Sequence, residues 1–361
     1  MTDEIRLAAP IIGPEEIEAV ERVLRSGMLA QGPEVRAFEA EFAPVAGGGH
    51  AIAVNSGTSA LLLGLLAMGV DAGHEVIVPS FTFAATANAV VLAGGSPVFV
   101  DINPATFCID PTAIEAAITE RTRAIIPVHL YGHPADMTAI SAIAKEHNLL
   151  VLEDAAQAHL AAIDGRPVGS FGDVAAFSFY PTKNMTTGEG GMVMTRNETI
   201  ASRVRLLRNQ GMEQRYRNEI AGYNMRMTDI QAAIGRVQLK SLPNWTSQRK
   251  RNARVLDGGL VGVEIPHVQA RCTHVYHQYT VRVPGGERDR LVEGVREQGI
   301  GCDVYYPVPV HRLPAFGLDL DLPETDRAAR EVLSLPVHPG LTERQLERIA
   351  TSVNAIVESA E

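Results

Sequence analysis

Short apolar runs alternate with longer helical segments through the first two thirds of the chain. Some of the segments between these runs, 59–69, 83–93 and 136–147, have helical spacing or composition. Near-continuous apolar strands separated by helices predict an α/β fold, with a mostly parallel sheet covered by helices on both faces. The runs with the composition of buried strands are 51–54, 75–79, 97–101, 124–129, 149–153, 174–179 and 191–194.

The two ends of the chain have a different pattern. Before residue 45 the sequence predicts helices separated by polar breaks, and the first begins at Pro14 with two glutamates in its first turn. Residues 227–257 predict one long polar helix, or two helices that meet at Pro243. Beyond it we expect strands at 277–283 and 301–306, and helices at 287–298, 326–333 and 342–357. We therefore predict a large α/β domain over residues 1–243 and a smaller C-terminal α+β domain over residues 244–361.

Composition and charge limit the classes of function. The 361 residues include 42 Asp and Glu against 32 Lys and Arg, a net charge of −10, which argues against a nucleic-acid-binding surface. Three distant cysteines without metal-ligand spacing predict no metal site and a reducing compartment. The most apolar stretch, 84–100, is interrupted and too short to span a membrane. With no secretion signal at the N-terminus, we expect a cytoplasmic protein that binds no membrane.

Lysine is scarce in this chain, so chemistry that needs a primary amine has four candidates. Lys145, Lys240 and Lys250 lie on predicted helices, where a solvated lysine is usual. Lys183 instead follows the strand 174–179 and precedes a loop of small and polar residues. Ligands of parallel sheets bind beyond the carboxyl ends of the strands, so we expect Lys183 in the ligand crevice. The alternative is an ordinary lysine on a surface loop.

Three further features follow the ends of predicted strands. The segment 55–59 opens a helix with small residues, which makes either an anion site or a plain capped helix start. Asp154 ends a very apolar strand and needs a cationic or hydrogen-bonding partner. Phe83 is placed to stack on a flat ligand or to pack in the core. Together these features match what pyridoxal phosphate needs: an amine, a phosphate-binding helix start, a buried carboxylate and an aromatic side chain that stacks on its ring.

These residues belong to longer motifs that follow one another along the whole chain. They include 31–33 with Phe38 and Glu39, 55–61, 75–83, 153–157, 178–184, 187–191, 222–229, 306–311 and 335–339. In these motifs the sequence resembles the DegT/DnrJ/EryC1/StrS family of fold-type I pyridoxal-phosphate enzymes, which are mostly sugar aminotransferases. The resemblance implies a fold-type I transferase with pyridoxal 5′-phosphate as its cofactor.

The resemblance also implies a role for each residue that matches a family motif. Lys183 would form the Schiff base with the cofactor, and Asp154 would bind the pyridine nitrogen. Gln157 would contact the O3′ side of the ring, on which Phe83 would stack. Gly57, Thr58 and Ser178 would hold the cofactor phosphate. Asn224 would reach the cofactor phosphate of the other subunit, so the resemblance also implies a homodimer with shared active sites.

The implied activity is transfer of an amino group to a keto-sugar, with L-glutamate as the expected donor. A nucleotide-diphosphate-linked keto-deoxyhexose is the expected acceptor, and a keto-cyclitol is the alternative. A non-catalytic sensor or regulatory protein that binds the cofactor is an alternative of another class. Family members with histidine at the lysine position dehydrate or deoxygenate their substrates, so Lys183 favours transamination. The expected substrate contacts are Gln31, His129, Arg215, Arg226, Tyr306 and His311.

Overall fold

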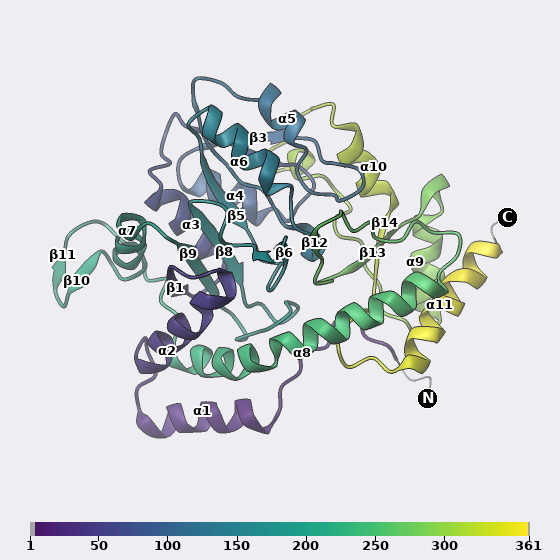
Figure 1. Ribbon diagram of the computed structural model, residues 1–361, viewed down its shortest axis with the longest axis horizontal. Helices are drawn as coiled ribbons and strands as arrows, with labels where there is room; N and C mark the ends of the chain where they lie inside the picture. The colour runs from purple at the N-terminus through teal and green to yellow at the C-terminus, as the bar shows by residue number, and fades with distance from the viewer. Residues whose placement is uncertain (1–3, 360–361) are drawn as a thin grey trace.

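A seven-stranded sheet organises the first two thirds of the chain in the computed structural model, which describes residues 4–359 (Figure 1). The strand order is β1-β9-β8-β5-β4-β2-β3. The five strands from β8 to β3 are parallel, whereas β9 is antiparallel to both of its neighbours. The expected mostly parallel sheet is therefore confirmed, with β1 His50–Val54, β2 Glu75–Pro79, β3 Ser96–Val100, β4 Thr122–Ile125, β5 Leu150–Asp154, β8 Val174–Ser178 and β9 Gly191–Thr195.

Helices cover both faces of this sheet, because alternate side chains of each strand point to opposite sides. On one face α3 (Gly57–Ala67), α4 (Ala85–Leu92) and α7 (Glu198–Arg208) enclose an aliphatic core. The other face has two cores, one beneath α5 (Pro111–Ala116) and α6 (Met137–Glu146) and one beneath α2 (Pro33–Phe42). Asp154 and Ser178 stand at the carboxyl ends of the neighbouring parallel strands β5 and β8.

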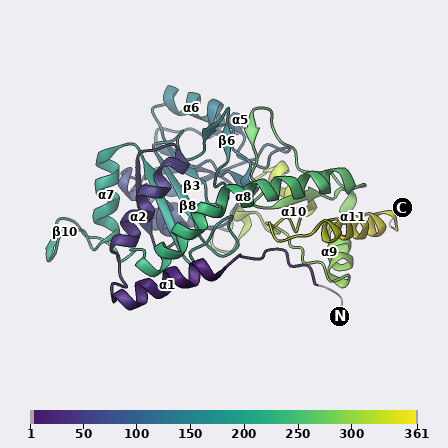
Figure 2. The ribbon, with the colours of Figure 1, turned by 60° about the horizontal axis from the view of Figure 1, so that its bottom comes forward.

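One long helix, α8 (Asp229–Gly259), extends along the molecule from α2 toward α11 (Figure 1). It continues through Pro243 without a break, so the single-helix alternative is the one that the structure adopts. Its first half packs against α1 (Pro14–Ser26) and α2, and α11 (Glu343–Glu358) packs against it as well (Figure 2). Residue 243, at which the sequence placed a domain boundary, lies inside this helix.

The C-terminal part is built on a two-stranded sheet in which β13 (Tyr279–Arg282) pairs with β14 (Val332–Leu335). The strand expected at 301–306 is wrong, since only Asp303 forms a bridge, with Ser334. Pro307 and Pro309 have no N–H to extend a ladder. The helix expected at 326–333 is α10 (Pro323–Glu331), which ends where β14 begins, and α9 (Arg288–Glu297) and α11 complete this part.

Smaller elements complete the architecture. A hairpin of β10 (Met212–Gln214) and β11 (Arg217–Asn218) projects from the body of the molecule in both views (Figures 1 and 2). A small sheet consists of β6 (Ala162–Ile163), β7 (Arg166–Pro167) and β12 (Cys272–Thr273). Within residues 4–359, no helix has both the length and the apolar character to cross a membrane.

Candidate active site

Lys183 lies in a turn just beyond the carboxyl end of β8. Its backbone N–H donates a hydrogen bond to the carbonyl of Tyr180 at 2.9 Å. Burial lowers the pKa of its amine to about 8, and the charge of Asp154 partly offsets that shift. Asp154 ends β5, the strand next to β8 in the sheet. The fold thus brings together the amine and the carboxylate that the sequence singled out.

The carboxylate of Asp154 is held by two neutral donors. Its Oδ2 accepts a hydrogen bond from Thr86 Oγ1 at 2.8 Å, and its Oδ1 accepts one from the N–H of Ala156 at 3.2 Å. Burial raises the pKa of Asp154, while these hydrogen bonds and the charge of Lys183 oppose the rise. A buried carboxylate of this kind is well matched to a protonated nitrogen of a heterocycle.

Thr86 is a residue of the site that the sequence reasoning missed. It lies in the first turn of α4, just after the carboxyl end of β2, and is 1% exposed. One sequence signal was available, because Thr86 is a polar residue within the predicted helix 83–93 that follows a strand end. The hydrogen bond to Asp154 is a contact that only the fold reveals.

The start of α3 offers free donors for an anion. The side chain of Ser56 accepts from the N–H of Ser59 at 3.1 Å, whereas within residues 4–359 the N–H groups of Gly57 and Thr58 have no protein acceptor. A Cβ atom on Gly57 would lie 2.7 Å from Cβ of Ser178, so only glycine allows this close approach of α3 to β8. Two backbone donors and the Ser178 hydroxyl therefore form a cradle that fits a phosphate.

Gln157 and Phe83 are both neighbours of Tyr306. Gln157 Oε1 accepts from the N–H of Tyr131 at 2.7 Å, and Gln157 Nε2 donates to the Tyr306 hydroxyl at 3.2 Å. The ring of Phe83 lies 6.0 Å from that of Tyr306 and is 60% exposed. Such exposure is not that of a core residue, so the Phe83 ring is available to stack on a flat ligand.

The two histidines expected to contact the substrate are fully buried. His129 Nε2 lies 3.0 Å from a carboxylate oxygen of Glu153, and its Nδ1 accepts from the N–H of Ala135. Because both ring nitrogens are bonded to protein, His129 packs beneath the site and does not line it. His311 Nδ1 is bonded to the Ser80 hydroxyl, while its Nε2 has no partner among the described residues.

The remaining expected residues lie on or near the projecting hairpin or the N-terminal helices. Arg215 stacks over the Tyr216 ring at 4.9 Å, and Arg226 donates to Asn209 Oδ1 at 2.9 Å. Asn224 is exposed, and Gln31 is half-buried with an unpartnered Oε1. Within the described chain, no hydrogen bond joins any of these four residues to Lys183 or Asp154.

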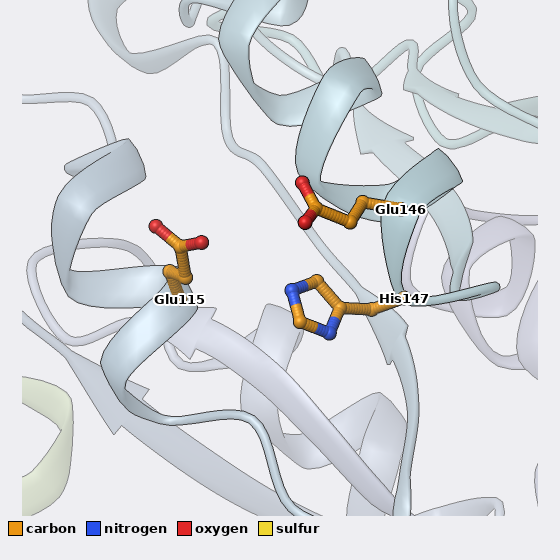
Figure 3. Close-up of side chains that lie close together, drawn as sticks. All are labelled: Glu115, Glu146 and His147. Atoms are coloured by element: carbon orange, nitrogen blue, oxygen red, sulfur yellow. The ribbon is translucent and has the colours of Figure 1, made fainter.

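One group of side chains elsewhere has the chemistry of a metal site. The ligand atoms of Glu115, Glu146 and His147 lie within 4.8 Å of one another on the exposed surface of α5 and the end of α6 (Figure 3). Metal-binding histidines are normally oriented by a second hydrogen bond, and no described residue supplies one to the ring of His147. This group precedes β5 and so lies at the opposite end of that strand from Asp154.

Comparison with known proteins gives consistent matches over nearly the whole chain. The model of the DegT/DnrJ/EryC1/StrS aminotransferase family matches residues 10–354. A Geobacillus stearothermophilus protein named as a pleiotropic regulatory protein is 45% identical over 94% of both chains. The dTDP-3-amino-3,4,6-trideoxy-α-D-glucose transaminase of Streptomyces venezuelae is 43% identical over 97% of this chain and 94% of its own.

A solved structure agrees with the fold as a whole. The crystal structure of S. venezuelae DesV, described as a complex with a ketimine intermediate, superposes with a TM-score of 0.92. That enzyme is 44% identical, and the match covers 95% of this chain and 94% of that one.

Proposed function

The chain belongs to the DegT/DnrJ/EryC1/StrS aminotransferase family, and we propose that it transfers an amino group from L-glutamate to a keto-deoxyhexose linked to a nucleoside diphosphate. Its enzyme class is pyridoxal-phosphate-dependent aminotransferase, and its cofactor is pyridoxal phosphate. The observation that carries the proposal is the pairing of the half-buried Lys183 with the buried carboxylate of Asp154, next to the strand end at which Gly57 opens α3 against Ser178.

When bound, pyridoxal phosphate supplies a carbonyl that reacts with amines and a ring that withdraws electrons from the adjoining carbon. Lys183 would hold the cofactor covalently and, once free, its Nζ would take the proton from the α-carbon of the donor. A lowered pKa makes the neutral amine available for that work. Asp154 would balance a positive charge on the ring nitrogen. The phosphate would be held by Gly57, Thr58 and Ser178, and the ring by Phe83 and Gln157.

The nucleotide-linked sugar is favoured over a keto-cyclitol by the relatives and by charge. The Streptomyces venezuelae relative carries the name of a transaminase for a dTDP-linked sugar. Arg215 and Arg226 precede and follow the hairpin strand β11 and offer guanidinium groups suited to a diphosphate. The Tyr306 hydroxyl is bonded to Gln157 and its ring lies near that of Phe83, so the hydroxyl is placed to meet a sugar beside the cofactor.

The acceptor is tested by offering candidate keto compounds to protein loaded with pyridoxamine phosphate. We expect nucleoside-diphosphate keto-hexoses to restore the visible absorption of pyridoxal phosphate at least about tenfold faster than inososes, because only they can engage a diphosphate site. The measurement is the rate of absorbance recovery for each compound, with Lys183→Ala protein as the control. Faster recovery with an inosose would establish the cyclitol alternative instead.

We further propose that the active protein is a homodimer whose sites are shared. Exposed apolar side chains cluster on the projecting hairpin and on α1, which is typical of an interface. They include Tyr216 (83% exposed) and Ile17 (65% exposed). Asn224 follows the hairpin and would reach the cofactor phosphate held by the partner subunit.

Mixing two inactive variants tests this sharing. Lys183→Ala removes the amine from one site, and Asn224→Asp places a negative charge beside the phosphate of the partner's site. In a mixed dimer both defects fall in one site and the other site is intact, so random mixing should restore about a quarter of wild-type activity. The measurement is activity after subunit exchange, with each unmixed variant as its control. No recovery in verified mixed dimers would contradict shared sites.

A regulatory role without catalysis is the competing proposal, and the name of the Geobacillus relative favours it. The pairing of Lys183 with Asp154 counts against it, because mere binding of a cofactor does not require a lysine of lowered pKa. Loss of the visible absorption band on adding L-glutamate distinguishes catalysis from binding alone.

A further inference from the structure

We propose that Tyr131 is a positioning residue, which closes a ring of hydrogen bonds that fixes the Gln157 amide and the Tyr306 hydroxyl at the active site. The inference rests on the role proposed above for Gln157 beside the cofactor. It assigns a task in this site to a residue that touches neither the Lys183 amine nor the Asp154 carboxylate.

The ring consists of three hydrogen bonds and one peptide unit. The N–H of Tyr131 donates to Gln157 Oε1 at 2.7 Å, and Gln157 Nε2 donates to the Tyr306 hydroxyl at 3.2 Å. From Tyr306 the chain leads back to Tyr305, whose carbonyl accepts a hydrogen bond from the hydroxyl of Tyr131. Tyr131 therefore donates two of the three hydrogen bonds in this ring, one from its backbone N–H and one from its side-chain hydroxyl.

The backbone of Tyr131 is held in the conformation that this ring needs. Its φ of 58° lies in the left-handed region, which costs a bulky residue energy and persists only where the surroundings enforce it. The C-terminal part provides that support: the N–H of Gln278 donates to the carbonyl of Tyr131, and the N–H of Val275 donates to that of Gly132. This strained residue is thus clamped from a segment far away in the sequence.

The side chain of Tyr131 is also restrained. It is 3% exposed and meets the ring of Phe107 edge-on, with 5.6 Å between centroids. Burial raises the pKa of its hydroxyl well above the ordinary value, so the group remains a donor to the Tyr305 carbonyl. A buried, protonated and well-packed hydroxyl is suited to fixing a position.

The ring has a consequence for the two groups that face the site. With Oε1 of Gln157 occupied by the N–H of Tyr131, the amide cannot flip, and its NH₂ group must face Tyr306. The Tyr306 hydroxyl accepts that bond, and no described residue accepts its own proton. That proton remains available for a bound ligand. Its position is fixed by the ring of hydrogen bonds that Tyr131 closes.

The substitution Tyr131→Phe removes only the hydrogen bond from the Tyr131 hydroxyl to the Tyr305 carbonyl and keeps the aromatic side chain. We expect the affinity of cofactor-free protein for pyridoxamine phosphate to fall about fivefold, as for one net hydrogen bond lost from the bound state. Pyridoxamine phosphate forms no covalent bond to Lys183, so its dissociation constant reports the non-covalent site alone. We also expect the pH midpoint of the visible absorption band to shift in the protein loaded with pyridoxal phosphate.

Tyr279→Phe is the matched control. Tyr279 is fully buried and its hydroxyl donates to Asp257 at 2.7 Å, in the core of the C-terminal part. Both variants should lower the melting temperature, but only Tyr131→Phe should weaken binding of pyridoxamine phosphate. The double variant Tyr131→Phe/Tyr306→Phe should lose less affinity than the product of the two single losses, since either change opens the same ring.

Equal melting-temperature losses with unchanged affinity in Tyr131→Phe would overturn the proposal and leave Tyr131 as a residue of the core. Fully multiplicative losses in the double variant would overturn it as well. The binding measurement uses no sugar and no amino donor, so failure of the proposed substrate would leave its outcome intact.

Discussion

Lys183→Ala protein is expected to lose transamination by at least about 10³-fold, because the same amine is both the covalent anchor and the proton carrier. The visible absorption band of the cofactor should be absent, and borohydride reduction should leave the protein mass unchanged. Wild-type protein should gain the mass of the cofactor on the same treatment. Lys145→Ala is the matched control, since Lys145 is exposed on α6.

The lowered pKa of Lys183 adds a pH dependence to this prediction. The neutral amine is the nucleophile, and its fraction rises as pH increases through the pKa of about 8. The rate at which cofactor-free protein forms its covalent bond to pyridoxal phosphate should therefore reach half of its maximum at about pH 8 and level off about one pH unit higher. A rate that continued to rise toward pH 10 would indicate an unperturbed lysine. Transamination retained by folded Lys183→Ala protein would refute the assignment itself.

Asp154→Asn is expected to lower kcat roughly 10³-fold, since it removes a buried negative charge from beside the ring nitrogen at a low effective dielectric. The amide has nearly the same shape and can keep a hydrogen bond with Thr86, so the protein should still fold. Steady-state kinetics with L-glutamate, together with the absorption spectrum of the bound cofactor, would measure the loss.

Thr86→Val is the matched control for Asp154. It removes one hydrogen bond to the carboxylate and keeps the charge, so the expected loss is only about fivefold. A comparable loss in both variants would show that the orientation of the carboxylate matters and its charge does not. Asp154→Asn protein with more than a tenth of wild-type kcat would contradict the assigned role.

The sequence was informative about the sheet because buried parallel strands have a strong and local signature. All seven apolar runs form strands, and Lys183 and Asp154 meet because the carboxyl ends of neighbouring parallel strands lie at one edge. The helix start at Gly57 could also be predicted from its small residues. The reason that position 57 must be glycine, the close approach to Ser178, could be seen only in the fold.

The parts of the site that could not be predicted depend on contacts between distant segments. Nothing local distinguishes Tyr131 from an ordinary core tyrosine, and its partners Gln157 and Tyr305 lie 26 and 174 residues away. His129 is another residue whose surroundings the sequence could not predict, because it ends the apolar run 124–129 and its partners come from other segments. Its bonds to Glu153 and Ala135 hold it inside the protein.

The continuity of α8 determines how this protein can be divided. Its second half buries Ala253 and Leu256 in the C-terminal core, and its first half buries Leu242 beneath the large sheet. A fragment cut at residue 243 would therefore split one helix and expose an apolar stripe on both pieces. A designer who wishes to exchange the C-terminal part between relatives should place the junction after Gly259, where the helix ends.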